Sequence, residues 1–239
     1  MPLPTIATPT YELELPSTGQ KIKYRPFLVK EEKLLLLALE SEDTKEISNA
    51  IKAVLKNCIQ TRSIKAENLP TFDIEFLFLN IRGKSVGEKI EVNLIAPDDG
   101  ETSVPVDINI DDIKIKKDPE HNKKIKLDEH LIMEMKYPSL DQFIKTNFDL
   151  SNQTNMDQSF SLISSCIDKI YNEEEVWAAS DVTKKELVEF LEQMNSMQFK
   201  QIEKFFETMP KLSHEITLKN PKTNVESTVV LEGLSSFFA

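Results

Sequence analysis

Histidines and runs of carboxylates are the side chains in this chain that could perform acid–base chemistry or bind a metal ion. The histidines are His121, His130 and His214, and the acidic runs are Asp98-Asp99, Asp111-Asp112 and Glu173–Glu175. No two histidines have the short spacing of a zinc-binding pair, and no acidic run has the alternating ligands and glycine of a calcium loop. We therefore predict no catalytic residue and no metal site, and we interpret the carboxylates as solvated surface.

A hydrolase or metal enzyme that uses these acidic runs is the alternative class. It requires several of the carboxylates to converge in one cleft, where their pKa values would be raised. Because no spacing in the sequence is typical of an acid–base pair, we favour a protein without enzymatic activity.

The cysteines and glycines exclude further kinds of site. Cys58 and Cys166 each lie on the apolar side of a predicted helix, so we expect buried free thiols and no disulfide. The chain has only five glycines and contains neither G-x-G-x-x-G nor a Walker A sequence. We therefore predict no bound cofactor.

The composition is that of an acidic globular protein. Of the 239 residues, 40% are hydrophobic and 29% are charged, which is enough apolar material for a packed core. The net charge of −11 argues against binding to nucleic acid or to an anionic membrane surface, because both need basic residues. It is compatible with a basic partner protein. We find no signal peptide and no apolar run of about 18 residues, so we expect no transmembrane helix and a reducing, cytoplasmic setting.

The stretch Leu69–Gly87 is the most apolar segment with clear boundaries, and its apolar residues cover most of a helix circumference. Such a helix is typically central and buried. We expect it to begin after an N-cap at Thr71, to end at Gly83 or Gly87, and to lie between helices on one side and a β-sheet on the other.

The periodicity of the whole chain predicts an α+β fold, a helical core that carries small antiparallel hairpins. Helices are predicted near 30–40, 44–59, 71–83, 156–170, 183–194 and 196–209, and hairpins at 11–27, 88–136 and 213–231. The predicted divisions are an extended arm (1–10), an N-terminal hairpin with helices (11–87), an antiparallel sheet insert (88–136), a helical region (137–212), and a C-terminal hairpin with an apolar tail (213–239).

Residues near the first hairpin and at the end of the chain are candidates for contact with a partner. Aromatic residues and arginine often anchor protein interfaces. The candidates are Tyr24, Arg25, Phe27, Lys30, Phe237 and Phe238. The alternative is that Tyr24 and Phe27 pack the hairpin against the first helix, since alternation buries one face of any strand. The tail is either tucked into the core or offered to a partner.

Four blocks of the chain together resemble one protein family. They are KIKYRPFLVKEEKLLLLALES (21–41), NLPTFDIEFLFLNIRGKSVGE (68–88), FFETMPKLSHEITL (205–218) and LEGLSSFF (231–238). In this order they are similar to the baseplate hub assembly proteins of T-even-like contractile-tailed bacteriophages, a family of bacteriophage base plate proteins. The RPF-x-x-KEEK block is the most specific part of the resemblance.

The resemblance implies a non-enzymatic viral protein that helps to build the central baseplate hub through protein–protein contacts, as a chaperone or assembly factor. The alternative is a structural subunit retained in the virion. Implied partners are other hub or tail proteins, with the tape-measure protein as a candidate, and neither nucleic acid nor membrane. The implied location is the host cytoplasm during assembly and, for a retained subunit, the virion tail baseplate.

The resemblance also bears on the final hairpin. Similar proteins often carry a Cys-x-x-Cys pair there, like a zinc-ribbon knuckle, whereas this chain reads Asn220-Pro-Lys-Thr-Asn224 with no thiolate. We therefore expect a metal-free, zinc-ribbon-like C-terminal hairpin. The turn at Pro97–Gly100 is expected to be a second metal-free knuckle.

Overall fold

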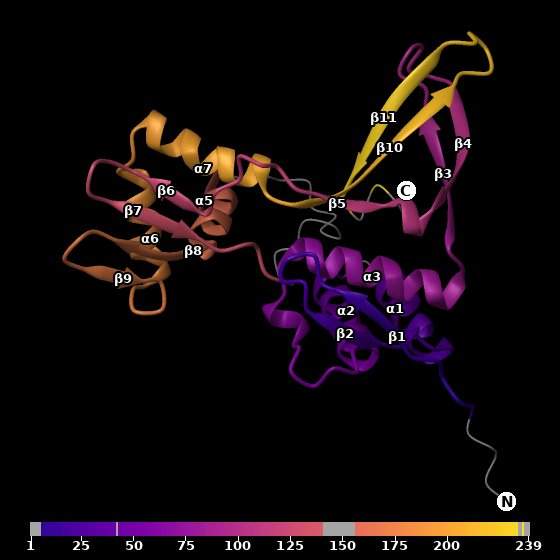
Figure 1. Cartoon of the computed structure of the whole chain (residues 1–239), viewed down its shortest axis with the longest axis horizontal. Coiled ribbons are helices and arrows are strands. Elements are labelled where there is room, and N and C mark those ends of the chain that lie inside the picture. Colours follow the sequence, from indigo (N-terminus) through magenta and orange to yellow (C-terminus); the bar gives the residue numbers. More distant parts are fainter. Residues whose placement is uncertain (1–5, 42, 141–155, 234–235, 237–239) are drawn as a thin grey trace, which may run out of the picture.

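The computed structural model describes residues 6–41, 43–140, 156–233 and 236. Buried apolar side chains form two clusters, which we call the large core and the small core. The N-terminal hairpin, three helices and two longer hairpins surround the large core, and a four-stranded sheet with three further helices surrounds the small core (Figure 1). The architecture is mixed α+β, as predicted.

Six α-helices lie within the described residues. They are α1 (Val29–Glu40), α2 (Thr44–Cys58), α3 (Thr71–Val86), α5 (Met156–Ser165), α6 (Lys184–Glu192) and α7 (Ser196–Thr208). There are also two short 3₁₀ turns. The turn η1 (Ala66–Asn68) precedes α3, and the turn η2 (Ile110–Asp112) follows β4. Capping boxes start α6 at Thr183 with Glu186, and α7 at Asn195 with Gln198, because each cap and its third helical residue exchange hydrogen bonds.

The strands form small antiparallel sheets. They are β1 (Tyr11–Glu14), β2 (Lys21–Tyr24), β3 (Lys89–Ile95), β4 (Ser103–Asn109), β5 (Lys114–Lys116), β6 (Lys124–Lys126), β7 (Ile132–Met135), β8 (Ile167–Tyr171), β9 (Val176–Ala178), β10 (Lys211–Lys219) and β11 (Glu226–Glu232). The sheet orders are β1-β2, β3-β4, β11-β10-β5 and β6-β7-β8-β9. The predicted hairpins at 11–27 and 213–231 are confirmed.

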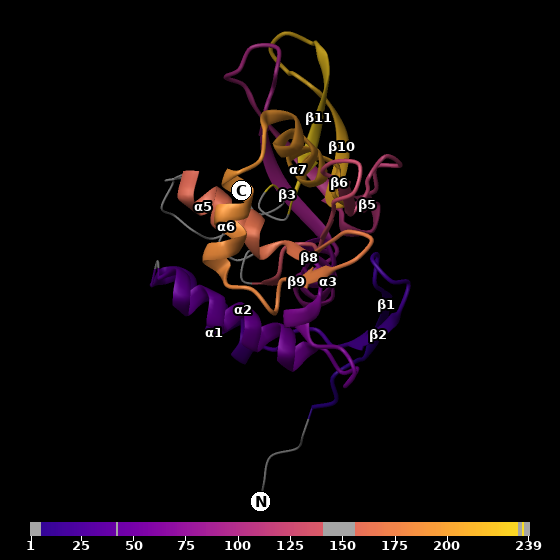
Figure 2. The same cartoon turned by 90° about the vertical axis from the view of Figure 1, so that its left-hand side faces the viewer.

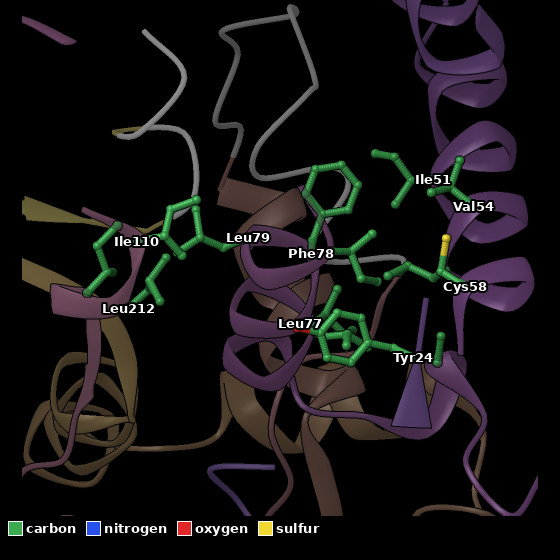
Figure 3. Packing of buried hydrophobic residues seen from close by; sticks show 14 of the residues in the cluster. Tyr24, Ile51, Val54, Cys58, Leu77, Phe78, Leu79, Ile110 and Leu212 are labelled. Atoms are coloured by element: carbon green, nitrogen blue, oxygen red, sulfur yellow. The ribbon is translucent and has the colours of Figure 1, made fainter. Parts of the chain in front are cut away.

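Helix α3 is the centre of the large core. Ile74, Leu77, Leu79 and Ile81 are completely buried although they point in different directions around the helix. Figure 3 shows α3 between α2 with the β2 residue Tyr24 on one side, and Ile110 with the β10 residue Leu212 on the other. The expected strand side is present with β10, but the other side combines α2 with the strand β2 and is not made of helices alone.

The N-terminal end of α3 differs from the prediction, whereas its C-terminal end lies at Gly87, one of the two predicted glycines. Thr71 is the first helical residue and Pro70 occupies the N-cap position, so the predicted cap was wrong. The helix passes Gly83 and ends at Val86, where Gly87 has a φ of 125°. Gly83 serves packing instead, because a Cβ there would lie 2.7 Å from Cδ1 of Ile110.

A buried carboxylate in the first turn of α3 fixes the N-terminal hairpin. Asp73 is fully buried and accepts hydrogen bonds from the backbone N–H and the hydroxyl of Ser17, which lies in the turn between β1 and β2. Burial raises the pKa of Asp73, although the hydrogen bonds from Ser17 oppose that shift. The hairpin turn is thereby held to the positive end of the α3 dipole.

The predicted single sheet over residues 88–136 is wrong, because its strands belong to three different sheets. Strands β3 and β4 form a hairpin of their own, β5 pairs with β10, and β6 and β7 pair with each other and with β8. Alternation along a strand identifies its two faces but does not identify its neighbour. The described strands and helices of the small core therefore lie, in sequence, between β5 and β10, which are adjacent strands of one sheet.

The predicted helix 156–170 is wrong beyond Ser165, because Ile167–Tyr171 forms the strand β8. Ile167 and Ile170 are both buried although they are three residues apart, a spacing that imitates a helix. The register of β8 against β7 shifts between Glu134 and Met135. Such a bulge turns both isoleucines toward the same core.

Aromatic contacts join the two cores. The ring of Phe72 on α3 meets Tyr137 edge-on at 5.0 Å between centroids, and Tyr137 stacks on His121 and on Phe205 of α7. The Nε2 atom of His121 lies 3.0 Å from the Tyr137 hydroxyl, and its Nδ1 lies 3.0 Å from Thr208 Oγ1. The Thr208 hydroxyl donates to a carbonyl oxygen of α7, so it accepts from Nδ1–H of a neutral imidazole.

Replacement of Leu77 by alanine should lower the free energy of unfolding by about 2–5 kcal/mol, because it leaves a cavity beside a completely buried side chain. Val86→Ala on the same helix is the matched control, since Val86 is 54% exposed and its loss should change stability by less than about 0.5 kcal/mol. Urea denaturation of the two variants measures the difference. Equal effects would show that α3 is not the centre of the core.

Candidate interaction site

The RPF-x-x-KEEK block contains a buried ion pair. The Nη2 atom of Arg25 lies 2.9 Å from Oε1 of Glu31, and the side chains are 13% and 2% exposed. The Leu28 N–H donates to the other carboxylate oxygen of Glu31 at 2.8 Å, so Glu31 also caps the N-terminus of α1. The backbone N–H of Arg25 donates to the Cys58 carbonyl at the end of α2. The block therefore ties β2, α1 and α2 together.

The charges of this pair stabilise each other. The hydrogen bond to Glu31 raises the pKa of Arg25, and this outweighs the opposing effect of burial. Burial favours the neutral form of Glu31, but the hydrogen bonds from Arg25 and Leu28 outweigh it and hold the pKa of Glu31 below its usual 4.5. The pair is thus an element of the fold. Without Arg25, the buried Glu31 would keep only the exposed Lys30, whose Nζ lies 3.6 Å from Oε1 of Glu31, as a cationic partner.

The remaining contact candidates of this region differ in exposure. Tyr24 is 2% exposed and packs in the large core, and the Arg25 side chain is 13% exposed and pairs with Glu31. We therefore do not propose Tyr24 or Arg25 as contacts with a partner. Phe27 is half-buried against the same core and donates its N–H to Ser85 Oγ at 3.0 Å. The Lys30 side chain is 69% exposed. Phe237 and Phe238 lie outside the described residues.

The two long hairpins, β3–β4 and β10–β11, meet at their tips. Both views show the tips together at the end of the molecule opposite the β1–β2 hairpin (Figures 1 and 2). Asn220 is completely buried, and its side-chain NH₂ donates to both oxygens of Asp98 at 3.0 and 3.1 Å and to Asp99 at 2.9 Å. Thr223 donates a further hydrogen bond to Asp98. A hydrogen-bonded junction therefore fixes the two turns that the sequence singled out as knuckles.

The carboxylates of this junction are ionised under ordinary conditions. Hydrogen bonds from Thr223 and Asn220 lower the pKa of Asp98, and those from the Thr102 hydroxyl and N–H lower the pKa of Asp99 further. Asn220 also accepts the N–H groups of Lys222 and Thr223 through its Oδ1 atom, which orients its NH₂ group toward the carboxylates.

Exposed apolar side chains lie on this pair of hairpins. Ile95 and Val225, which are 53% and 46% exposed, border the two turns, and we call these two residues the tip surface. Val230, which is 47% exposed, lies farther from the turn on β11, where it pairs with Glu215. Sequence reasoning missed them, although a signal was present. In Leu94-Ile95 and Val229-Val230 two apolar residues are adjacent within a strand, and alternation forces one of each pair away from the core.

The side chains that could perform chemistry, which are the histidines, carboxylates and cysteines, are either far from one another or already held in contacts of the fold. Within the described ranges, no three His, Cys, Asp or Glu side chains are grouped so as to hold a metal ion. His121 is held in the aromatic contact between the cores, where burial and the nearby Lys123 lower its pKa. Both cysteines are buried free thiols, as expected, and burial raises each pKa to about 11. Such thiols are unreactive near neutral pH.

Residues Gly83–Gly87 spell G-x-S-x-G, the pattern of a hydrolase nucleophile elbow, which sequence reasoning passed over. That elbow requires a sharp turn between a strand and a helix. Here Ser85 lies in the last turn of α3, where its hydroxyl donates to the Ile81 carbonyl at 2.6 Å and accepts the N–H of Phe27. The structural context therefore does not support a nucleophile.

Replacement of Arg25 by methionine should destabilise the protein by up to about 3–5 kcal/mol at pH 7. The buried Glu31 would then keep as its cationic partner only the exposed Lys30, whose Nζ lies 3.6 Å from Oε1 of Glu31. The deficit should shrink as the pH falls below about 4.5, since a protonated Glu31 needs no cation. Lys23→Met on the same β-hairpin is the control, because the Lys23–Glu12 pair is exposed and its loss should cost less than about 1 kcal/mol. Chemical denaturation at several pH values compares the variants.

Replacement of Asn220 by aspartate should open the tip junction, because it removes the donated hydrogen bonds and places a third carboxylate beside Asp98 and Asp99. We expect a lower Tm and faster amide exchange in the two turns, with a smaller difference from the unmodified chain at pH 4 than at pH 7. Asn93→Asp makes the same chemical change at an exposed position of β3 and should leave exchange at the tips unchanged. Unaltered exchange in N220D would contradict the junction.

Within the described residues, no helix is long and apolar enough to cross a membrane. The family model described as T4 bacteriophage base plate protein matches residues 8–239. No curated protein and no solved structure matches the chain. A match over nearly the whole chain supports a role in the phage baseplate and contact with other tail proteins. We conclude that this chain belongs to the T4 bacteriophage base plate protein family.

Proposed function

We propose that this protein serves the assembly of the central baseplate hub through protein–protein contacts, as an assembly factor and without catalysis. The observation that carries the proposal is the family match over residues 8–239. The absence of a metal-holding group among the described residues and the buried state of both thiols support a function by contact. We propose other hub or tail proteins as partners, with the tape-measure protein as one candidate.

The tip surface is the contact region that the geometry favours. The tips project away from both cores, and the junction at Asn220 holds them in one arrangement before any partner arrives. A preorganised surface loses less conformational freedom on binding than a flexible one. Ile95 and Val225 offer apolar area there. Phe27, Lys30 and the tail residues Phe237 and Phe238 are further proposed contacts, in the last two cases on the basis of the sequence.

A structural subunit retained in the virion is the second candidate, and it differs from the first only in the fate of the chain. The net charge of −11 disfavours a direct role in holding phage DNA in either case. Mass spectrometry of purified virions separates the two. An assembly factor should be absent from mature particles, and a subunit should be present in a fixed ratio to other baseplate proteins.

Co-expression with each of the phage's baseplate and tail proteins, followed by affinity capture, should recover at least one of them. The double replacement Ile95→Asp and Val225→Asp should reduce that recovery at least tenfold, because it places charge in an apolar contact. Val176→Asp is the matched control, since Val176 on β9 is 65% exposed and lies in the part of the molecule around the small core. Circular dichroism verifies that all variants are folded.

Two results would overturn the proposal in different ways. Recovery of no baseplate or tail protein, together with normal hubs in a phage that lacks this chain, would remove the assembly function. Normal recovery by the I95D/V225D variant would keep the function but exclude the tip surface as its contact.

A further inference from the structure

Helix α1 carries an apolar stripe that no described part of the chain covers. Val29, Leu36 and Leu37 are 79%, 55% and 53% exposed, although leucine and valine are usually buried. The helix packs against α2 through its opposite face, where Leu35 and Ala38 join the large core. Four consecutive leucines cannot all face one side of a helix, so most of the run Leu34–Leu37 points to solvent.

Two opposite charges extend this stripe. At about 100° per residue, Val29, Lys33, Leu36 and Glu40 fall within an arc of about 60°. Leu37 lies about 40° outside that arc, and the buried Glu31 and Ala38 lie on the far side of the helix. Lys33 and Glu40 are both exposed. In sequence order the stripe reads apolar, basic, apolar, apolar, acidic.

The acidic end of the stripe is unfavourable for an isolated helix. Glu40 lies in the last turn of α1, which contains no basic residue, and a carboxylate there opposes the negative end of the helix dipole. A cation supplied from outside would relieve this repulsion. Lys33 has the right charge but lies seven residues away on the same helix, so it cannot reach Glu40 of its own chain.

We propose that the α1 stripe is the contact of a dimer in which two copies of this chain pack their α1 helices antiparallel. With a two-fold axis between Leu36 and Leu37, each Leu36 faces Leu37 of the second copy. The same axis brings Lys33 of each copy opposite Glu40 of the second copy. The segment Lys33–Glu40 is thus complementary to itself when reversed, as a two-fold contact requires. Val29 lies beyond this segment and has no counterpart on the second α1.

This symmetry favours a second copy over a different protein as the occupant. In the sequence, the midpoint between Lys33 and Glu40 is the same as the midpoint between Leu36 and Leu37. A single two-fold axis at that point therefore pairs opposite charges and also pairs the leucines. A contact made by one helix pair is small compared with stable interfaces of 1,200–2,000 Å². We therefore expect a weak dimer, with a Kd on the order of tens of micromolar.

Sedimentation velocity of the full chain over a concentration series of about 1–500 µM, a range that brackets the expected Kd, should show a reversible shift from monomer to dimer. Replacement of Leu36 and Leu37 by glutamine should weaken the dimer at least tenfold. Met197→Gln is the matched control, because Met197 on α7 is 79% exposed and should leave the dimer unchanged. Thermal unfolding followed by circular dichroism shows that each variant is folded.

Charge reversal tests the register of the two helices. The Lys33→Glu change alone places two carboxylates opposite each other in the dimer, and the Glu40→Lys change alone places two ammonium groups opposite each other. Because like charges repel, each single variant should remain monomeric. A mixture of the K33E and E40K proteins should form a heterodimer, because both of its cross-contacts then join opposite charges. The K33E/E40K double variant should regain self-association. Lys200→Glu on α7 is the control for a change of net charge.

Three results would overturn the proposal. The first is a chain that stays monomeric throughout the concentration series. If the α1 variants of such a monomeric chain also fail to capture another tail protein, the stripe serves that protein and not a second copy. The second is a dimer that survives the L36Q/L37Q change. The third is a mixture of K33E and E40K that fails to associate. None of these results bears on capture through the tip surface, so the two proposals fail separately.

Discussion

Burial of α3 on nearly all sides is the constraint on which the rest of the structure depends. A helix that is apolar around its circumference must be surrounded, and no single neighbour can surround it. The N-terminal hairpin, α2, η2 and β10 each cover part of it, although they are far apart in the sequence. Asp73 fixes the position of the first hairpin on α3, because its carboxylate accepts a hydrogen bond from Ser17 in the hairpin turn.

The residues that carry the family resemblance most specifically prove to maintain the fold. Arg25 and Glu31 form a buried pair that joins β2 to the start of α1, and Glu31 caps that helix as well. The surfaces that we propose for partners lie where apolar residues face away from the cores, at the hairpin tips and along α1. In both places the sequence has adjacent apolar residues, which a strand or an amphipathic helix cannot bury together.

The junction of the hairpin tips connects the two turns that resemblance had marked as knuckles. This chain has no cysteine in either turn, and the two turns meet where Asn220 contacts Asp98 and Asp99. Hydrogen bonds from an amide to ionised carboxylates provide a specific link between two loops. The likeness of this hairpin to a zinc ribbon stays a prediction, whereas the pairing of its strands is confirmed.

Local patterns in the sequence determined the α+β class, the central place of α3, the burial of both cysteines and two of the three hairpins. These features depend on neighbouring residues, so periodicity predicts them. Only the tertiary structure decided that the strands of 88–136 separate into three sheets, that a bulge makes β8 imitate a helix, and that Arg25 lies inside. Strand pairing and ion pairing join distant residues, and their choice depends on how the whole chain packs around α3.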